Sequence, residues 1–189
     1  MDSQAPLGEC PAEPLSVALE AIKRDAAAGL GDVERLLDRY PGDHRLHFLR
    51  GSLLAGLSRY DAARRCLETA TRLAPDYAVA RFQLGFLELT SGEPARATAT
   101  WAPLHRLPKQ DALRLFAAGL EHLINDRFAP AIETLEAGIA RNADLPPLNA
   151  DMRLIIEKIC ALQPAAGSEE PLSAAHLLLQ RYKTNAKPH

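Results

Sequence analysis

Residue types that favour a sheet, a disulfide framework or a membrane segment are scarce in this sequence. Leucine and alanine dominate the 189 residues, and the only valines are Val17, Val33 and Val79, a balance that favours helix over strand. The three cysteines stand far apart and form no CxxC pair, so neither a disulfide framework nor a structural zinc site is indicated. No basic leader is present, and no apolar run approaches the ~18 residues that span a bilayer. We therefore expect a soluble, cytoplasmic protein.

The sequence also lacks the signals of catalysis and of nucleic-acid binding. Its formal net charge is −2, with acidic and basic residues interspersed, so no field is evident that would recruit nucleic acid or anionic lipid. No phosphate-binding glycine loop, HExxH zinc motif or GxSxG motif occurs. His44 and His47 could share one helix face with a metal, but no third ligand follows at a defined spacing. We expect a protein that is not an enzyme, with no cofactor and no metal.

What the sequence does contain is an internal repeat, with a period of about 34 residues. Four sets of residues recur with this step: Gly51, Gly85 and Gly119; Ala63, Ala97 and Ala131; Leu67, Trp101 and Leu135; and Tyr60, Pro94 and Phe128. Each period holds two helix-like runs joined by a short turn, which predicts antiparallel helix pairs. The predicted pairs are 43–57 with 60–73, 77–90 with 93–106, and 110–124 with 128–141.

Less regular helices are expected on either side of the three repeats. Upstream, residues 14–28 and 32–40 form a shorter pair, with Asp32 as a plausible N-cap of its second helix. Downstream, residues 148–162 form one more helix after the break at Pro146-Pro147.

A helix–turn–helix unit with a period of about 34 residues resembles the tetratricopeptide repeat family. The residues that match its pattern are Gly51, Leu54, Ala63, Leu67, Ala70 and Pro75 in 44–77; Leu84, Gly85, Ala97 and Trp101 in 78–111; and Gly119, Ala131 and Leu135 in 112–145. The departures are Arg50 in place of leucine, Glu88 and His122 in place of aromatic residues, and Lys109 in place of proline. The resemblance implies an all-α fold, a right-handed α-solenoid of antiparallel helix pairs over residues 14–162.

The recurring glycines fit this interpretation. Glycine costs about 1 kcal/mol relative to alanine inside a helix. We expect Gly51, Gly85 and Gly119 to lie where the two helices of each pair touch, since a Cβ there would hold the backbones apart.

The resemblance also implies which side chains line the concave surface, because the first helix of each pair faces it. The side chains implied are Arg45, Phe48, Ser52, Val79, Phe82, Phe86, Leu89, Leu113, Phe116, Leu120 and Leu123. The carboxylate clamp of chaperone-binding members needs lysine, asparagine and arginine, and here Phe48, Phe86 and Leu113 stand instead. An apolar groove suits an amphipathic helix or an extended apolar peptide. The alternative is that this side is closed and the residues are core.

Both ends of the chain are expected to differ from the repeats. Residues 1–13 are predicted to be a flexible segment, 163–170 a linker and 184–189 a tail. Between the last two, residues 171–183 predict an amphipathic helix with Leu172, Ala175, Leu178, Leu179 and Tyr182 on its apolar stripe. This helix could cap the solenoid, lie in its groove or pair with a second copy of the chain.

Together these features predict a protein–protein interaction adaptor of unknown partner, without nucleic-acid or membrane binding. The residues predicted to carry binding are Phe82, Phe86, Phe116 and Leu120. One alternative is a chaperone for a secreted or assembling protein, which rests on architecture alone. The other is a self-associating structural module that uses residues 171–183 to form a homo-oligomer.

Overall fold

The computed structural model describes residues 8–162, and this part of the chain is helical without a strand. Its elements in chain order are α1 (Ala12–Arg24), α2 (Ala26–Arg39), α3 (His44–Gly56), α4 (Tyr60–Leu73), α5 (Ala78–Thr90), α6 (Pro94–Trp101), the 3-10 helix η1 (Ala102–Arg106), α7 (Ala112–Ile124), α8 (Phe128–Arg141) and α9 (Pro146–Leu162). The all-α class is as predicted. The predicted linker, C-terminal helix and tail at 163–189 lie outside the described residues.

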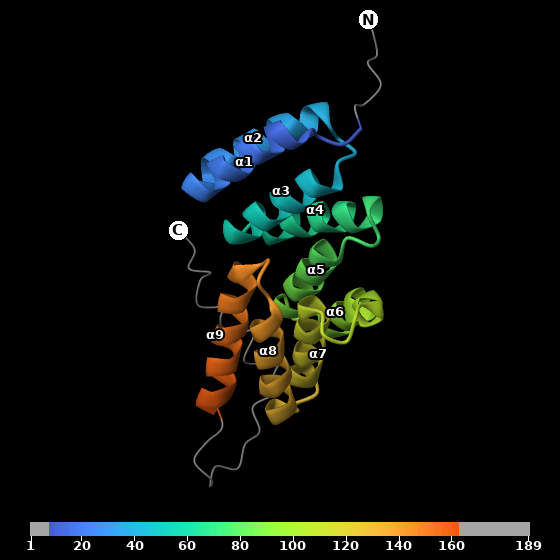
Figure 1. Ribbon diagram of the computed structural model, residues 1–189, viewed down its shortest axis with the longest axis vertical. Coiled ribbons are helices and arrows are strands. Elements are labelled where there is room, and N and C mark those ends of the chain that lie inside the picture. Colours follow the sequence, from blue (N-terminus) through green and yellow to red (C-terminus); the bar gives the residue numbers. More distant parts are fainter. Residues whose placement is uncertain (1–7, 163–189) are drawn as a thin grey trace, which may run out of the picture. The chain divides into compact units, whose positions relative to one another are not determined.

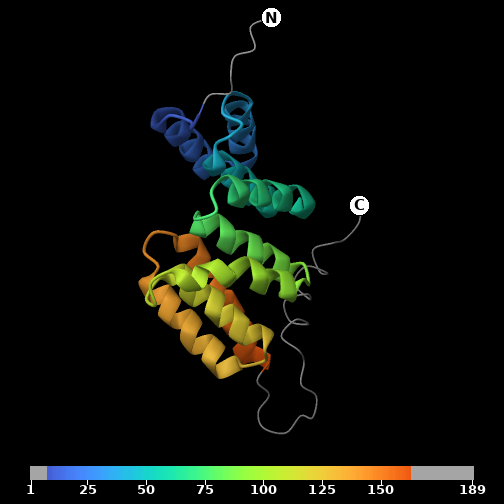
Figure 2. The same cartoon turned by 90° about the vertical axis from the view of Figure 1, so that its right-hand side faces the viewer.

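Helices that follow one another in the chain pack as pairs, and α3 with α4 and α7 with α8 confirm two of the three pairs predicted from the repeat. Figures 1 and 2 show α1 beside α2, α3 beside α4 and α7 beside α8. The second helix of each repeat begins at one of the recurring residues Tyr60, Pro94 and Phe128. Among the helices of the described part, none is both long enough and apolar enough to cross a membrane.

The first helix pair differs from its prediction. The two helices cover 12–24 and 26–39 rather than 14–28 and 32–40. Asp25, not Asp32, is the N-cap of α2, and its carboxylate accepts hydrogen bonds from the N–H groups of Ala27 and Ala28 at 2.8 and 3.4 Å. Asp32 lies inside α2 and pairs with Arg35. The cap at Asp25 starts α2 six residues earlier than predicted.

Prolines account for two further differences in helix boundaries. The predicted helix at 93–106 becomes α6 up to Trp101 and then η1, which contains Pro103. Proline lacks the N–H that continues an α-helix, and its ring clashes with the preceding turn. Pro146 begins α9 rather than preceding it, because the first turn of a helix needs no N–H from that residue.

The described residues divide into two compact units, 8–87 and 88–162, each with buried apolar side chains of its own. The core of the first unit includes Val33, Leu46, Leu54, Ala63 and Leu67. Large buried side chains of the second include Trp101, Phe116, Leu120, Leu135, Met152 and Ile159. The recurring residues Ala63, Ala97 and Ala131 are each 0% exposed, so the period of the repeat is the period of the buried positions.

Close approach at glycine holds the helix pairs together. A Cβ at Gly51 would lie 2.8 Å from Cγ of Leu67, and one at Gly119 would lie 2.7 Å from Cγ of Leu135. Both distances are shorter than a normal van der Waals contact, which confirms the predicted role of these glycines. The first pair has an equivalent that the repeat did not predict. A Cβ at Gly29 of α2 would lie 2.8 Å from Cα of Ile22 in α1.

The turns between the two helices of each repeat share one backbone conformation. Ser58, Gly92 and Asp126, again one repeat period apart, have φ values of 59°, 85° and 54°. In each turn the next N–H donates to the carbonyl five residues earlier: Arg59 to Leu54 at 2.8 Å, Glu93 to Glu88 at 2.9 Å and Arg127 to His122 at 2.9 Å. This left-handed C-cap satisfies carbonyls that the end of the first helix would otherwise leave unpaired.

Two of the polar departures from the repeat pattern, Glu88 and His122, are accommodated inside the second unit. Glu88 is 2% exposed, and its carboxylate accepts a hydrogen bond from Thr100 Oγ1 at 2.7 Å and lies 3.4 Å from Arg96 Nε. Nδ1 of His122 is buried without a hydrogen-bond partner in the described part of the chain. Burial lowers the pKa of His122, helped by Arg127 and opposed by Glu121, which favours the neutral ring.

We predict opposite effects for two glycine substitutions in the same helix. Gly29→Ala places a Cβ against backbone atoms of Ile22, which cannot rotate away, so the unfolding free energy falls by about 2 kcal/mol. Gly31 has nothing within 4 Å of its Cβ position, so Gly31→Ala raises stability by up to about 1 kcal/mol through helix propensity. Urea denaturation measures both. Equal effects of the two substitutions would contradict close packing at Gly29.

Candidate functional site

The structure separates the predicted groove residues into two groups by burial. Phe82, Leu89, Phe116, Leu120 and Leu123 are all 2% exposed or less. The remaining members are partly exposed: Arg45, Phe48, Ser52, Val79, Phe86 and Leu113. Five of these six belong to the first unit, and Leu113 belongs to the second. Three of the four residues expected to carry binding are therefore buried side chains, and Phe86 is the partly exposed one.

Within the first unit, the partly exposed members extend along two neighbouring helices. Phe48 and Ser52 are one turn apart on α3, and Val79 and Phe86 are two turns apart on α5. Three more partly exposed side chains complete this set: His44, Tyr77 and Gln83. We call these seven residues the α3/α5 surface. Phe82 packs beneath it, with its ring 6.1 Å from that of Phe86 and nearly parallel.

Three rings form the aromatic end of the α3/α5 surface. Tyr77, immediately before α5, meets His44 edge-on with ring centroids 4.8 Å apart and Phe48 edge-on at 5.4 Å. Such geometry directs the positive edge of one ring at the negative face of another. Burial raises the pKa of the Tyr77 phenol. The phenol is therefore neutral at physiological pH and can serve as a hydrogen-bond donor or acceptor.

A polar contact joins α3 to α5 farther along the surface. Ser52 Oγ lies 2.9 Å from the carbonyl oxygen of Phe48 and 2.5 Å from the side-chain amide of Gln83. The Gln83 atom in this contact is Oε1, an acceptor, so the single hydrogen of the Ser52 hydroxyl is shared between two carbonyl oxygens, that of Phe48 and that of the Gln83 side chain. The amide nitrogen of Gln83 then remains as a donor beside the apolar side chains.

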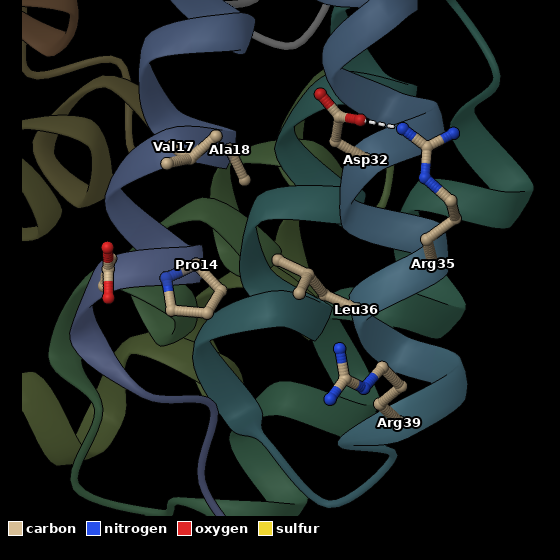
Figure 3. Close-up of a pocket in the computed structure, with 8 residues that line it drawn as sticks. Pro14, Val17, Ala18, Asp32, Arg35, Leu36 and Arg39 are labelled. Carbon is tan, nitrogen blue, oxygen red and sulfur yellow. Dashed lines mark hydrogen bonds and ion pairs between the residues drawn. The ribbon is translucent and has the colours of Figure 1, made fainter.

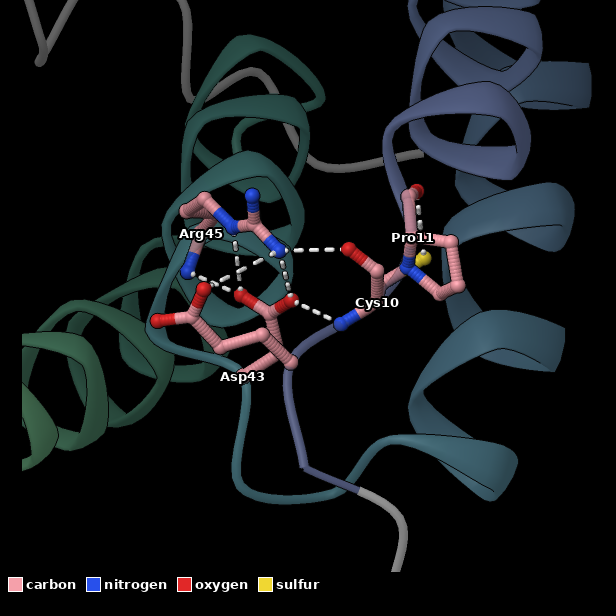
Figure 4. A network of polar contacts seen from close by, with 5 residues as sticks. Cys10, Pro11, Asp43 and Arg45 are labelled. Carbon is pink, nitrogen blue, oxygen red and sulfur yellow. Dashed lines mark hydrogen bonds and ion pairs between the residues drawn. The ribbon is translucent and has the colours of Figure 1, made fainter.

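Arg45, predicted to face the groove, is instead part of a network at the start of α3 (Figure 4). The fully buried carboxylate of Asp43 accepts hydrogen bonds from the Arg45 guanidinium at 2.7 and 3.0 Å. It also accepts from the N–H of Arg45 at 2.8 Å and from the N–H of Cys10 at 2.7 Å. The guanidinium in turn donates to the carbonyl of Cys10 at 2.7 Å. Residue 10, expected within a flexible segment, is thus fixed to α3 by both of its backbone groups.

The ionisation of Asp43 depends on this network. Burial alone would raise its pKa, but the hydrogen bonds from the Arg45 side chain, the Cys10 N–H and the Arg45 N–H outweigh burial and lower the pKa below its ordinary value. Asp43 is therefore a carboxylate at physiological pH, and Arg45 is occupied by it rather than offered to a ligand.

The sequence pattern could have revealed two of the three residues that the prediction missed. His44 lies one turn before Phe48, and Gln83 one turn after Val79, so the same helical spacing includes them once polar residues are counted. Tyr77 is the first residue of the predicted helix 77–90, but it lies two residues before Val79, which does not fit this spacing.

The histidines considered for a metal have other contacts. His44 packs on Tyr77, and Nε2 of His47 lies 2.8 Å from the carbonyl oxygen of Pro41. Among residues 8–162, no three side chains of histidine, cysteine, aspartate and glutamate are grouped as metal ligands would be.

We predict that the Asp43 network makes stability depend on acidity. Because the folded-state pKa is lowered, its stabilisation is complete above the unfolded-state value of about 4 and is lost as pH falls through the lower folded-state value. Asp43→Asn retains a helix cap but abolishes the ion pair, so it costs about 2 kcal/mol at pH 7 and flattens the decline in stability below about pH 4.

Asp111→Asn is the matched control in the second unit. Asp111 caps α7 by accepting from the N–H groups of Leu113 and Arg114 at 2.9 and 3.2 Å, and asparagine caps equally well. Urea denaturation at several pH values measures both variants. A loss in Asp111→Asn equal to that in Asp43→Asn would show that capping, not the ion pair, is responsible.

Comparison with known proteins bears on the fold. No family model matches the chain, and no curated protein sequence matches it. Among solved structures, the chain is similar to MamA from Desulfovibrio magneticus RS-1, residues 41 to the end, with a TM-score of 0.56 and 14% identity over 81% of this chain and 96% of that chain. A structure of the MamA RS-1 ArsTM double mutant gives the same TM-score, identity and coverage. The likeness shows a shared all-helical repeat fold.

Proposed function

We propose that this protein is a non-catalytic interaction module that binds an apolar segment of a partner protein on the α3/α5 surface. The observation that carries the proposal is the group of partly exposed rings of His44, Phe48 and Tyr77 within one unit. Aromatic side chains supply large apolar contact areas at low cost in conformational entropy, and they are frequent in protein interfaces.

The chemistry of the surface defines the ligand. Phe48, Val79 and Phe86 offer apolar contacts, and the Gln83 amide beside Ser52 offers a fixed polar group. A ligand with apolar side chains on one face and an accessible backbone carbonyl or polar acceptor side chain fits this arrangement. Arg45 is engaged by Asp43, so no charged anchor is assigned to the ligand.

The likeness in fold supports the proposal only in general terms, because one fold can serve many functions. The resemblance of the sequence to the tetratricopeptide repeat family agrees with a binding role for the first helices of the pairs. The further alternatives, a chaperone and a self-associating module, have no specific observation in residues 8–162 that favours them over an adaptor.

We predict that a charge at Phe48 weakens peptide binding. A random-peptide phage library selected on the full chain supplies the ligand, which is then synthesised with a fluorophore and titrated by anisotropy. Phe48→Glu removes buried aromatic contact and places a carboxylate in the interface, so affinity falls at least about tenfold. Phe86→Glu is expected to do the same at the other end of the surface.

Leu73→Glu is the control for this experiment. Leu73 is also an apolar residue in the first unit, 37% exposed at the end of α4, and it does not belong to the α3/α5 surface. Its substitution leaves affinity unchanged, and circular dichroism checks that all three variants retain their helices. Undiminished binding by a folded Phe48→Glu, or an equal loss in Leu73→Glu, would refute the proposed site.

A further inference from the structure

The first helix pair contains an open cleft that shares no residue with the α3/α5 surface (Figure 3). Its volume is about 510 Å³, and its lining residues come from α1 and α2 alone: Glu13, Pro14, Val17, Ala18, Asp32, Arg35, Leu36 and Arg39. In Figure 3 the α1 side chains Pro14 and Val17 lie across from Leu36 of α2, which gives the cleft an apolar floor. The cleft lies entirely within the first unit.

The cleft lies on the side of α2 that faces away from α3. Glu34 marks the side that faces α3, because its carboxylate pairs with Arg50 of α3 at 3.0 Å. At about 100° per residue, Asp32 and Leu36 each lie about 160° around the helix from Glu34. In a stack of helix pairs, each pair packs through two opposite sides. The cleft therefore occupies the position on which a further helix would stack.

The exposure of the floor is unusual for the outer face of a helix pair. Val17 is 60% exposed, the highest value among the large apolar side chains of residues 8–162. Outer faces of end repeats are ordinarily polar, because they remain in contact with water. An apolar floor on this side favours a surface that is covered by a partner.

The charges on the rim indicate what the partner carries. Asp32 and Arg35 pair with each other along α2, as Figure 3 shows, so they neutralise one another. Glu13 on the α1 edge has no ion-pair partner in the described part of the chain, nor does Arg39 on the α2 edge. The guanidinium of Arg39 lies 5.7 Å from the centroid of the neighbouring Tyr40 ring. The cleft thus has one acidic edge and one basic edge.

We propose that this cleft binds an amphipathic α-helix of another protein, with a basic residue on one flank of its apolar stripe and an acidic residue on the other. The lining residues of α2 run from 32 to 39, about 10 Å at 1.5 Å per residue, which matches two turns of a bound helix. Apolar residues at i, i+4 and i+7 cover Val17 and Leu36. The basic residue of the bound helix faces Glu13, and its acidic residue faces Arg39.

Three synthetic helical peptides, each about four turns long, test the proposal on the full chain. They share leucines at i, i+4 and i+7 and differ only in their flanks: lysine and glutamate, lysine on both, or glutamate on both. The protein binds the mixed peptide about fivefold more tightly than either other peptide, as measured by fluorescence anisotropy at low salt. Arg39→Glu changes the preference to the peptide with two lysines, and Glu13→Lys changes it to the peptide with two glutamates.

Val17→Asp tests the floor of the cleft. A charge at this position weakens the mixed peptide at least about tenfold, whereas Leu73→Asp, at an exposed apolar position of α4, leaves the affinity for this peptide unchanged. Val17 is largely exposed, so the substitution does not disturb the core.

Several results would overturn the proposal. If Val17→Asp leaves the affinity for the mixed peptide unchanged, or if the protein binds the three peptides equally tightly, the cleft is not a binding site for a charged amphipathic helix. A dimer in light scattering that Val17→Asp converts to monomer would identify a second copy of the chain as the occupant. Stronger peptide binding by full-length Leu178→Asp would identify the chain's own C-terminal residues as the occupant of the cleft.

Discussion

The close approach of two helix backbones is the constraint on which the pairs in this structure depend. At Gly51, Gly119 and Gly29 a side-chain carbon would meet the partner helix at 2.8 Å or less. Close packing of this kind maximises dispersion contacts, which are weak individually and large in sum. It also fixes how one helix lies on the other, so the side chains on the remaining faces keep their positions. The α1/α2 cleft, and α3 in the α3/α5 surface, derive their geometry from helices placed in this way.

Polar interactions act where the glycine contacts do not reach. Asp43 is the clearest example, since one buried carboxylate caps α3, binds Arg45 and holds the backbone of residue 10. A buried charge is stabilising only when nearly all of its hydrogen-bonding capacity is used, and that condition is met here. Glu88 is a second case in the other unit, bonded to Thr100 beside Arg96. These residues set the ends and crossings of helices, whereas the apolar residues supply most of the burial.

Sequence reasoning was most successful where a residue type repeats for a physical reason. The repeat period of glycine, alanine and the large apolar residue predicted helix pairs and their crossing points. Each of these residues has the size that the contact between the two helices requires. It was less successful at Asp25, Pro103 and Gly29, where local capping or packing decides a boundary without a repeated signal. For the site, helical spacing identified Phe48 and Phe86 but could not distinguish them from Phe82 and Phe116, which are buried. Spacing gives the face of a helix, and burial depends on what other elements place against that face.

The left-handed turns at Ser58, Gly92 and Asp126 have a consequence for how such a chain can be rebuilt. The three positions hold different residues in one backbone conformation, each one repeat period from the next. The segment from 59 to 92 and the segment from 93 to 126 therefore begin and end at joints of the same shape. In engineering terms these segments are interchangeable cassettes: a chain could be lengthened, shortened or reordered at these joints without a new loop. Serine and aspartate at two of the joints indicate that backbone geometry, rather than residue identity, defines the boundary of the cassette.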